Sequence, residues 1–181
     1  MEKILVTGGA GFIGSSLVNK PSQKGYEVFV LDNLSFGNRA FISLVDDNHF
    51  FDVDLLHERQ IMECLLNIQP EFVIHLAAIH FIPYCNEYPF ESANINITGT
   101  LNLLDACEKA KSVTKFLFAS SAAVYPVCDK AVDENVKPAP VDIYGLSKYA
   151  GEKLRVWFVV FLTRLARMKR THMSFLRYRS K

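Results

Sequence analysis

Short apolar runs alternate with one-sided helical patterns along the first 155 residues of the chain. The runs rich in β-branched and aromatic residues are Lys3–Thr7, Glu27–Asp32, His49–Asp54, Phe72–Ala77 and Lys115–Ser120. The segments with helical spacing are Phe12–Asn19, Leu56–Asn67, Ile95–Lys109 and Tyr144–Phe158, and Pro21 is expected to end the first helix at Lys20. Strands that alternate with helices favour a parallel sheet with crossover helices. The pattern therefore predicts an α/β fold.

A glycine-rich turn joins the first predicted strand to the first predicted helix. Gly8, Gly11 and Gly14 follow one another with the spacing GxxGxxG. Such glycines allow a tight turn, a close approach of the backbone to a pyrophosphate, and close packing of the helix on the strand. Asp32 ends the second strand, where a carboxylate accepts ribose hydroxyls and repels a 2′-phosphate. This context predicts a Rossmann-type doubly wound parallel sheet that binds NAD rather than NADP, with a glycine turn without a ligand as the alternative.

A second set of polar residues lies further along the chain. Tyr144 and Lys148 are four residues apart and so share one face of a predicted helix. An ammonium beside a phenol favours the phenolate, so we expect Lys148 to lower the pKa of Tyr144 towards the range of a general base. Ser120 and Ser121 follow a buried strand, at the edge where open α/β sheets bind ligands. These residues predict a catalytic site beside the dinucleotide site.

The chain resembles the extended short-chain dehydrogenase/reductase family, and within it the NAD-dependent epimerase/dehydratase enzymes that are similar to UDP-glucose 4-epimerase. The resemblance covers residues 1 to about 155 and rests on motifs that occur in the family's order. They are Thr7–Gly14, Asp32–Ser35, Asp54–Leu55, His75–Ala78, Asn96–Thr100, Ser120–Tyr125 and Tyr144–Lys148. These residues are expected to form the NAD-binding Rossmann domain with the catalytic Tyr and Lys.

The resemblance implies a role for each motif. Ser121, Tyr144 and Lys148 would be catalytic, with Tyr144 as the base, and Asn96 would belong to a network that supports the active site. The implied cofactor-binding residues are Gly8, Gly11, Phe12, Ile13, Gly14, Asp32, Asn33, Asp54, Leu55, Leu76, Ala77, Ala78, Asn96, Tyr144 and Lys148. The implied reaction is the epimerisation of a nucleotide sugar, with a UDP-hexose as substrate, through transient oxidation of carbon 4 by NAD.

Two alternatives to an active epimerase stay open. Family members that dehydrate or decarboxylate the sugar carry acidic residues after the catalytic hydroxyl, whereas this chain has Ala122 and Ala123, which favours epimerisation. The second alternative is a truncated module that binds NAD without turnover, because 181 residues are too few for the C-terminal substrate domain of the family. The resemblance also implies a homodimer formed through the helix with Tyr144 and its neighbour near residues 95–109.

The charge of the chain changes at Glu152. Every charged residue after it is basic, although the formal net charge of the whole chain is only +1. Residues 156–181 are therefore interpreted as a basic divergent tail from a truncated or shifted reading frame, with residues 172–178 resembling a further strand. The tail lacks the aromatic interleaving and the fold context of a nucleic-acid-binding segment. Neither nucleic acid nor a membrane is predicted as a partner.

The remaining composition points to a cytoplasmic protein. The four cysteines have no metal-like spacing, so we expect free thiols in a reducing compartment and no metal site. No apolar run is long enough to span a membrane, and no signal peptide precedes the first strand. His75 is expected to be a hydrogen-bonded core histidine, whereas His80, Tyr84 and Cys85 are expected in a loop near the substrate.

Overall fold

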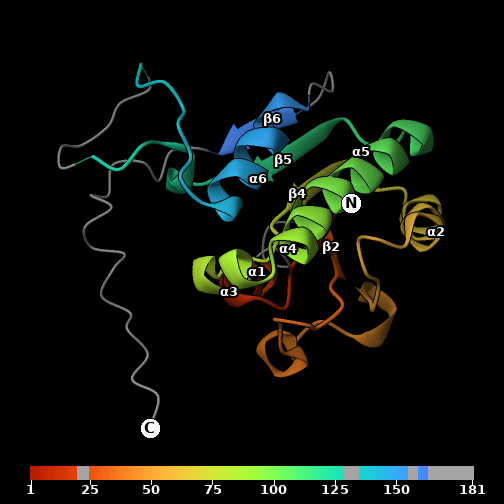
Figure 1. Ribbon diagram of the computed structural model, residues 1–181. Helices are drawn as coiled ribbons and strands as arrows, with labels where there is room; N and C mark the ends of the chain where they lie inside the picture. Colours follow the sequence, from red (N-terminus) through yellow and green to blue (C-terminus); the bar gives the residue numbers. More distant parts are fainter. Residues whose placement is uncertain (20–24, 129–134, 155–158, 163–181) are drawn as a thin grey trace, which may run out of the picture.

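The centre of the molecule is a parallel sheet in the order β3-β2-β1-β4-β5-β6 (Figure 1). The computed structural model describes residues 1–19, 25–128, 135–154 and 159–162, so that most of the basic tail, including residues 172–178, lies outside the described residues. The strands are β1 (Glu2–Thr7), β2 (Tyr26–Leu31), β3 (Phe50–Phe51), β4 (Phe72–His75), β5 (Lys115–Ala119) and β6 (Val159–Leu162). This order reverses between β1 and β4, as in a doubly wound dinucleotide-binding sheet. The predicted Rossmann-type α/β fold is confirmed.

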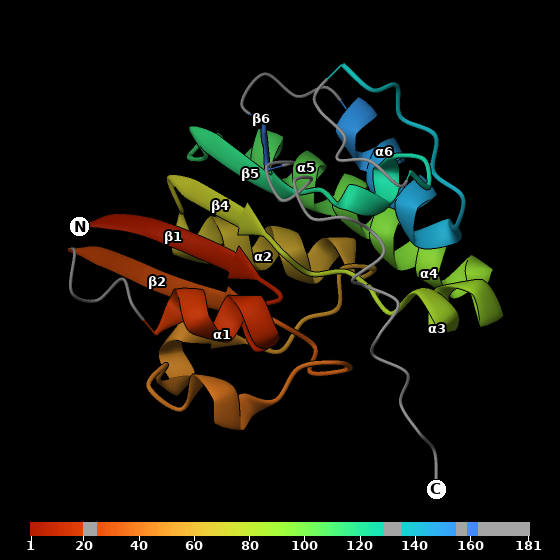
Figure 2. The same ribbon diagram turned by 90° about the vertical axis from the view of Figure 1, so that its left-hand side faces the viewer.

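Helices cover both faces of the sheet (Figure 2). They are α1 (Phe12–Val18), α2 (Glu58–Ile68), α3 (Ile82–Glu87), α4 (Pro89–Ala93), α5 (Gly99–Ala110) and α6 (Ile143–Lys153), with a π-helical turn η4 (Asn94–Thr98) and 3-10 turns η2 (Arg39–Ile42), η3 (Asp47–His49) and η5 (Ala122–Val124). Neighbouring residues of a strand point to opposite faces. Leu5 therefore packs with α2 and α5, while Val6 packs with α1 and η2. This two-sided burial explains why the central strands lack alternation.

Several boundaries differ from the predictions. The third strand is only Phe50–Phe51, because the Asp54 carboxylate accepts from the Leu56 N–H at 2.8 Å and its carbonyl accepts from the His57 N–H, which turns the chain away from the sheet. The first helix ends at Val18, with Asn19 as its C-cap, instead of at Lys20. The segment after His80, predicted as a loop, contains α3 and α4.

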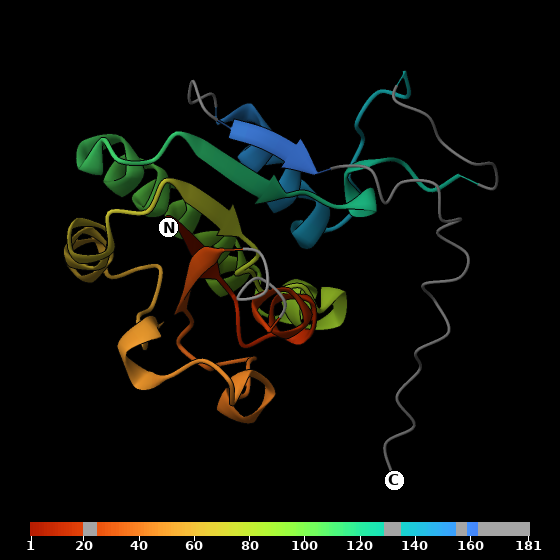
Figure 3. The ribbon, with the colours of Figure 1, turned by 180° about the vertical axis from the view of Figure 1, so that it is seen from behind.

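The end of the described chain also differs. Helix α6 stops at Lys153 instead of Phe158, because Leu154 has an extended backbone with ψ 92°. Val159–Leu162 then forms β6 beside β5 (Figure 3). The prediction missed this strand, which extends the sheet beyond the domain boundary expected at residue 155.

Candidate functional site

A cleft of about 460 Å³ lies at the carboxyl ends of β1, β2, β4 and β5. It spans the point between β1 and β4 where the strand order reverses, which is where open α/β sheets bind ligands. Fourteen of the fifteen predicted cofactor-binding residues line it; Asn96 does not. The residues that also line the cleft but are outside the predicted cofactor-binding set are Leu31, Ser35, Phe36, Gly37, Phe41, Val53, Ile79, His80, Ile95, Ala119 and Ser120.

The glycine-rich turn between β1 and α1 lines this cleft. Gly8 has φ +70°, and a Cβ built on it would lie 2.6 Å from the backbone nitrogen of Ala77. A Cβ on Gly14 would lie 2.2 Å from the Gly8 carbonyl oxygen, so only glycine lets α1 begin so close to the turn. Both positions lack room for any side chain. The resulting bare backbone at the start of α1 is the kind of surface that a pyrophosphate can approach closely.

Three polar side chains cluster at the β2 end of the cleft. The two oxygens of the Asp32 carboxylate accept hydrogen bonds from the backbone N–H groups of Ala10 and Leu34, both at 2.9 Å. Asn33 donates through Nδ2 to the Asp54 carboxylate at 2.7 Å. Backbone and side-chain donors fix both carboxylates in place, and both residues line the cleft. Oriented carboxylate acceptors are suited to the hydroxyls of a ribose.

Tyr144 and Lys148 line the other end of the cleft, which β5 and α6 form, and Ser121 lies next to Tyr144 just outside the cleft lining. The Asp142 carboxylate accepts from the Gly145 N–H at 2.7 Å and caps α6, which starts the helix that carries Tyr144 and Lys148. The Lys148 ammonium lies 6.0 Å from the centre of the Tyr144 ring. Ser121 is hydrogen-bonded to Tyr144. The structure therefore brings together the three residues predicted to be catalytic.

The electrostatics of this trio differ from the prediction. Burial raises the pKa of Tyr144, and the hydrogen bond with Ser121 lowers it by a smaller amount. Lys148 is only 3% exposed, and burial lowers the pKa of its ammonium to about 8. The expected net lowering of the Tyr144 pKa is not found, because the loss of water around the phenolate outweighs the hydrogen bond with Ser121.

The two serines after β5 have different surroundings. Ser120 lines the cleft, and its hydroxyl donates to the Glu152 carboxylate of α6. Ser121 is outside the cleft lining; its oxygen accepts from the Ala123 N–H at 3.2 Å and caps η5. The contact between Ser120 and Glu152 ties the end of β5 to the helix that carries Tyr144.

Asn96 is buried outside the cleft lining and connects two segments of the site. Its amide is 3% exposed, accepts from the Ile79 N–H at 2.8 Å, and donates to the Ile79 carbonyl and to the Ser147 hydroxyl. These bonds join the segment after β4 to the helix of Lys148. The structure thus places Asn96 in the expected supporting network and not at the surface that a cofactor would contact.

The histidine and cysteine predictions can also be compared with the structure. His75 is fully buried between the hydroxyls of Thr7 and Thr100, at 2.6 and 3.0 Å, which confirms a hydrogen-bonded core histidine. All four cysteines are free thiols; Cys128 alone is partly exposed. Tyr84 and Cys85 lie in α3 instead of a loop.

The described residues offer neither a metal cluster nor a membrane-spanning helix. In the described part of the chain, no group of three or more His, Cys, Asp or Glu side chains is arranged to hold a metal ion. Among the same residues, no helix combines the length and the apolar character needed to cross a lipid bilayer.

Known proteins match this chain in sequence and in fold. The chain is 37% identical over 128 residues to a UDP-glucose 4-epimerase of Klebsiella pneumoniae, a match that covers 68% of this chain and 91% of the relative. The UDP-glucose 4-epimerase of Thermus thermophilus, solved with NAD, matches with a TM-score of 0.77 and 38% identity over 83% of this chain and 48% of that one. The enzyme of Thermotoga maritima, solved with UDP-glucose, matches with a TM-score of 0.76 and 36% identity over the same shares of the two chains.

The chain spans about half the length of these two solved structures and of several curated relatives. The family uses NAD, and the bare glycine turn and the oriented Asp32 and Asp54 carboxylates fit that cofactor. The model of the NAD dependent epimerase/dehydratase family matches residues 4–159, which include every predicted site residue. The chain belongs to the NAD dependent epimerase/dehydratase family.

Proposed function

We propose that this chain binds NAD in the cleft and carries the catalytic residues of a nucleotide-sugar 4-epimerase. One observation carries the proposal: a single cleft has Asp32 and Asp54 at one end and Tyr144 with Lys148 at the other. Asp32 and Asn33 would hold the adenosine ribose, the glycine turn would face the pyrophosphate, and Lys148 would face the nicotinamide ribose. When bound, NAD supplies a hydride acceptor and a positive charge.

In this proposal Tyr144 handles the proton of the sugar 4-hydroxyl. It takes the proton while carbon 4 is oxidised and returns it when the ketone is reduced on its opposite face. Ser121 steadies the phenol through the hydrogen bond between them. Because burial raises the pKa of Tyr144, the phenolate needs nearby positive charge, which a protonated Lys148 would offer, with its ammonium 6.0 Å from the centre of the ring. Lys148 would therefore have to be charged for the reaction.

The residues after Ser121 favour epimerisation over loss of water. Dehydration of the sugar requires a second acid or base beside the reacting carbons. Ala122 and Ala123 occupy the positions where dehydrating members carry acids. The carboxylates that line the cleft are Asp32 and Asp54, which lie at its β2 end. The cleft wall near Tyr144 therefore offers no carboxylate for elimination among the described residues.

A second candidate follows from the extent of the chain. Since the chain spans about half the length of its structural relatives, a module that binds NAD without turnover is the alternative. The epimerase and the NAD-binding module differ in turnover alone, because both require the same cofactor cleft.

Calorimetry of the purified chain with NAD tests the shared step. We expect NAD to bind more tightly than NADP, and Asp32→Ala to weaken NAD binding, since the Asp32 carboxylate lines the cleft. Interconversion of UDP-glucose and UDP-galactose, abolished in Tyr144→Phe, would support the epimerase. NAD binding without turnover would leave only the binding module, and no NAD binding would overturn both.

A further inference from the structure

The ring of Phe36, a residue that lines the cleft, contacts the ring of Tyr84, which lies outside the cleft lining. Phe36 lies in the segment after β2, directly beyond the Asp32–Asn33 pair, and its ring lines the cleft. Tyr84 lies in α3, which the chain reaches after β4. The ring centres are 5.5 Å apart at an interplanar angle of 81°, an edge-to-face contact. Such pairs are favourable beyond the area that they bury.

Tyr84 is the firmly held partner of this contact. Its hydroxyl donates to the Glu91 carboxylate at 3.0 Å, and its ring lies 4.6 Å from the ring of Tyr88. Cys85 beside it is fully buried, and its thiol lies 3.5 Å from the Ile79 carbonyl oxygen. Tyr84 does not line the cleft itself. It can therefore act on a bound molecule only through the ring that it contacts.

Phe36 is the more exposed partner of this contact. The residue is 53% exposed, and it lies between two anchored points of the backbone. On one side the Leu34 N–H donates to Asp32, and on the other the Asn38 N–H donates to the Ala10 carbonyl at 3.0 Å. Leu34 has φ +57° and Gly37 follows Phe36, so the segment forms a tight turn with Phe36 inside it. The first anchor is the carboxylate expected to hold the adenosine ribose, and the second lies in the glycine turn.

We propose that the contact between Phe36 and Tyr84, which we call the aromatic bridge, holds NAD in the cleft and has to open before the dinucleotide leaves. The inference rests on the proposed function. An epimerase that oxidises and then reduces the same sugar regenerates its cofactor, so the cofactor has no need to leave between turnovers. A bridge that joins the adenosine wall to α3 slows release without adding a contact at the reacting atoms.

The test measures NADH release from the whole chain by the fall in its fluorescence on mixing with excess NAD. Tyr84→Leu removes the ring that does not line the cleft, and Phe36→Leu removes its partner. We expect each variant to release NADH about threefold to tenfold faster, and the double variant to be no faster than the faster single one. Tyr84→Phe, which keeps the ring, should release NADH at nearly the wild-type rate.

Phe41→Leu is the matched control, because Phe41 also lines the cleft and is 55% exposed. In the double variant, the fold increases in the NADH release rate caused by Phe41→Leu and by Tyr84→Leu should multiply, as expected for independent sites. An unchanged release rate in Tyr84→Leu, or effects of Phe36→Leu and Tyr84→Leu that simply multiply, would overturn the bridge while NAD binding itself stands. A wild-type chain that binds neither NAD nor NADH would overturn the proposed function and the bridge together.

Discussion

The ammonium of Lys148 lies 4.9 Å from the centre of the Phe118 ring, in a position that is almost closed to solvent. Burial lowers its pKa to about 8, so the charged form costs stability at neutral pH. We predict that Lys148→Met stabilises the chain by about 1–3 kcal/mol at pH 7 and abolishes catalysis. Chemical denaturation of the wild type and the variant measures the difference.

The pH dependence gives a second check on Lys148. Between pH 8 and the ordinary pKa of 10.5, the unfolded state binds a proton that the folded state has released, so the wild type gains stability as pH rises. The amount by which Lys148→Met exceeds the wild type in free energy of unfolding should therefore shrink over this range. Lys153→Met, at an exposed position of the same helix, should show no such trend. A destabilised Lys148→Met at pH 7 would contradict the prediction.

His75 is predicted to make the chain sensitive to acid. Its imidazole is enclosed by Thr7 and Thr100, and burial, assisted by the charge of Lys148, lowers its pKa to about 3. Below about pH 6.5 the unfolded state binds a proton that the folded state does not bind. The free energy of unfolding therefore falls as pH falls towards 3. We expect a loss of about 2–3 kcal/mol by pH 4 from this residue.

The variant His75→Gln isolates the contribution of the imidazole. It should be less stable than the wild type at pH 7, because an amide of another shape replaces a ring with two hydrogen bonds. The difference between the two proteins should then narrow between pH 6.5 and 4, as followed by denaturation at each pH. A constant difference across that range would show that His75 is not the group responsible.

Local sequence patterns were enough for much of the fold and the cofactor wall. Gly8, Gly14 and Asp32 were predictable because each stands at a fixed position after a strand. The tight backbone turn requires the two glycines there, and the ligand requires the carboxylate. The i, i+4 spacing of Tyr144 and Lys148 likewise follows from helix geometry. Such features depend on neighbours in the sequence, and the structure places all of them on one cleft.

Features that depend on tertiary packing were not predictable. Phe36 and Phe41 line the cleft only because distant segments meet there. The raised pKa of Tyr144 comes from burial, which the sequence spacing does not contain. The sequence did contain a signal for the starts of helices α3 and α4. Pro83 and Pro89 occupy their first turns, where proline is favoured.

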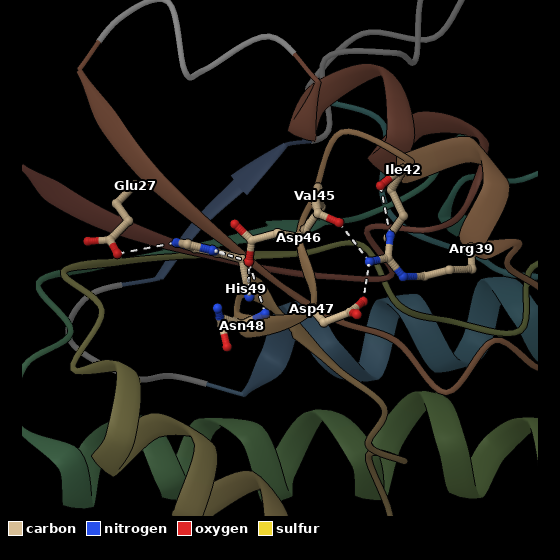
Figure 4. Close-up of polar contacts among 8 residues, drawn as sticks. All are labelled: Glu27, Arg39, Ile42, Val45, Asp46, Asp47, Asn48 and His49. Carbon is tan, nitrogen blue, oxygen red and sulfur yellow. Dashed lines mark hydrogen bonds and ion pairs between the residues drawn. The ribbon is translucent and has the colours of Figure 1, made fainter.

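His49 is predicted to stabilise the chain most at acidic pH. Its ring nitrogens lie 2.8 Å from Asp46 and 3.3 Å from Glu27, and its ring stacks on Phe29 at 4.7 Å (Figure 4 shows the two carboxylates). The hydrogen bond with Asp46 is the largest cause of the raised pKa of this imidazole. Its contribution is therefore complete below the unfolded value of 6.5 and is lost as pH rises through the folded pKa.

We expect His49→Gln to be less stable than the wild type at pH 5.5 by up to about 1 kcal/mol, because the ion pairs are partly exposed. The difference should be smaller at pH 9, and thermal melting at the two values measures it. Arg39→Gln serves as a control, because it removes a neighbouring cation whose guanidinium donates to the carbonyls of Ile42 and Val45 and to Asp47. An equal pH trend in both variants would contradict the role of His49.

The glycine turn makes a prediction that separates folding from cofactor binding. A Cβ on Gly14 would lie 2.2 Å from the Gly8 oxygen and 2.6 Å from the Gly9 Cα, so Gly14→Ala has to displace α1 and should cost about 3 kcal/mol. A Cβ on Gly11 would meet the Gly8 oxygen at 3.3 Å, and φ there is −79°, which alanine adopts readily. Gly11→Ala should therefore cost less than about 1 kcal/mol.

Both glycines line the cleft, so both variants should weaken NAD binding. Gly14→Ala should do so because the turn itself is displaced, whereas Gly11→Ala should do so because its methyl group stands where the pyrophosphate approaches the backbone. Urea denaturation and NAD calorimetry on the two variants measure stability and binding separately. Equal losses of stability would mean that α1 is not packed on the turn as closely as the contact at Gly14 requires. Unchanged NAD binding in Gly11→Ala would mean that the pyrophosphate does not approach the start of α1.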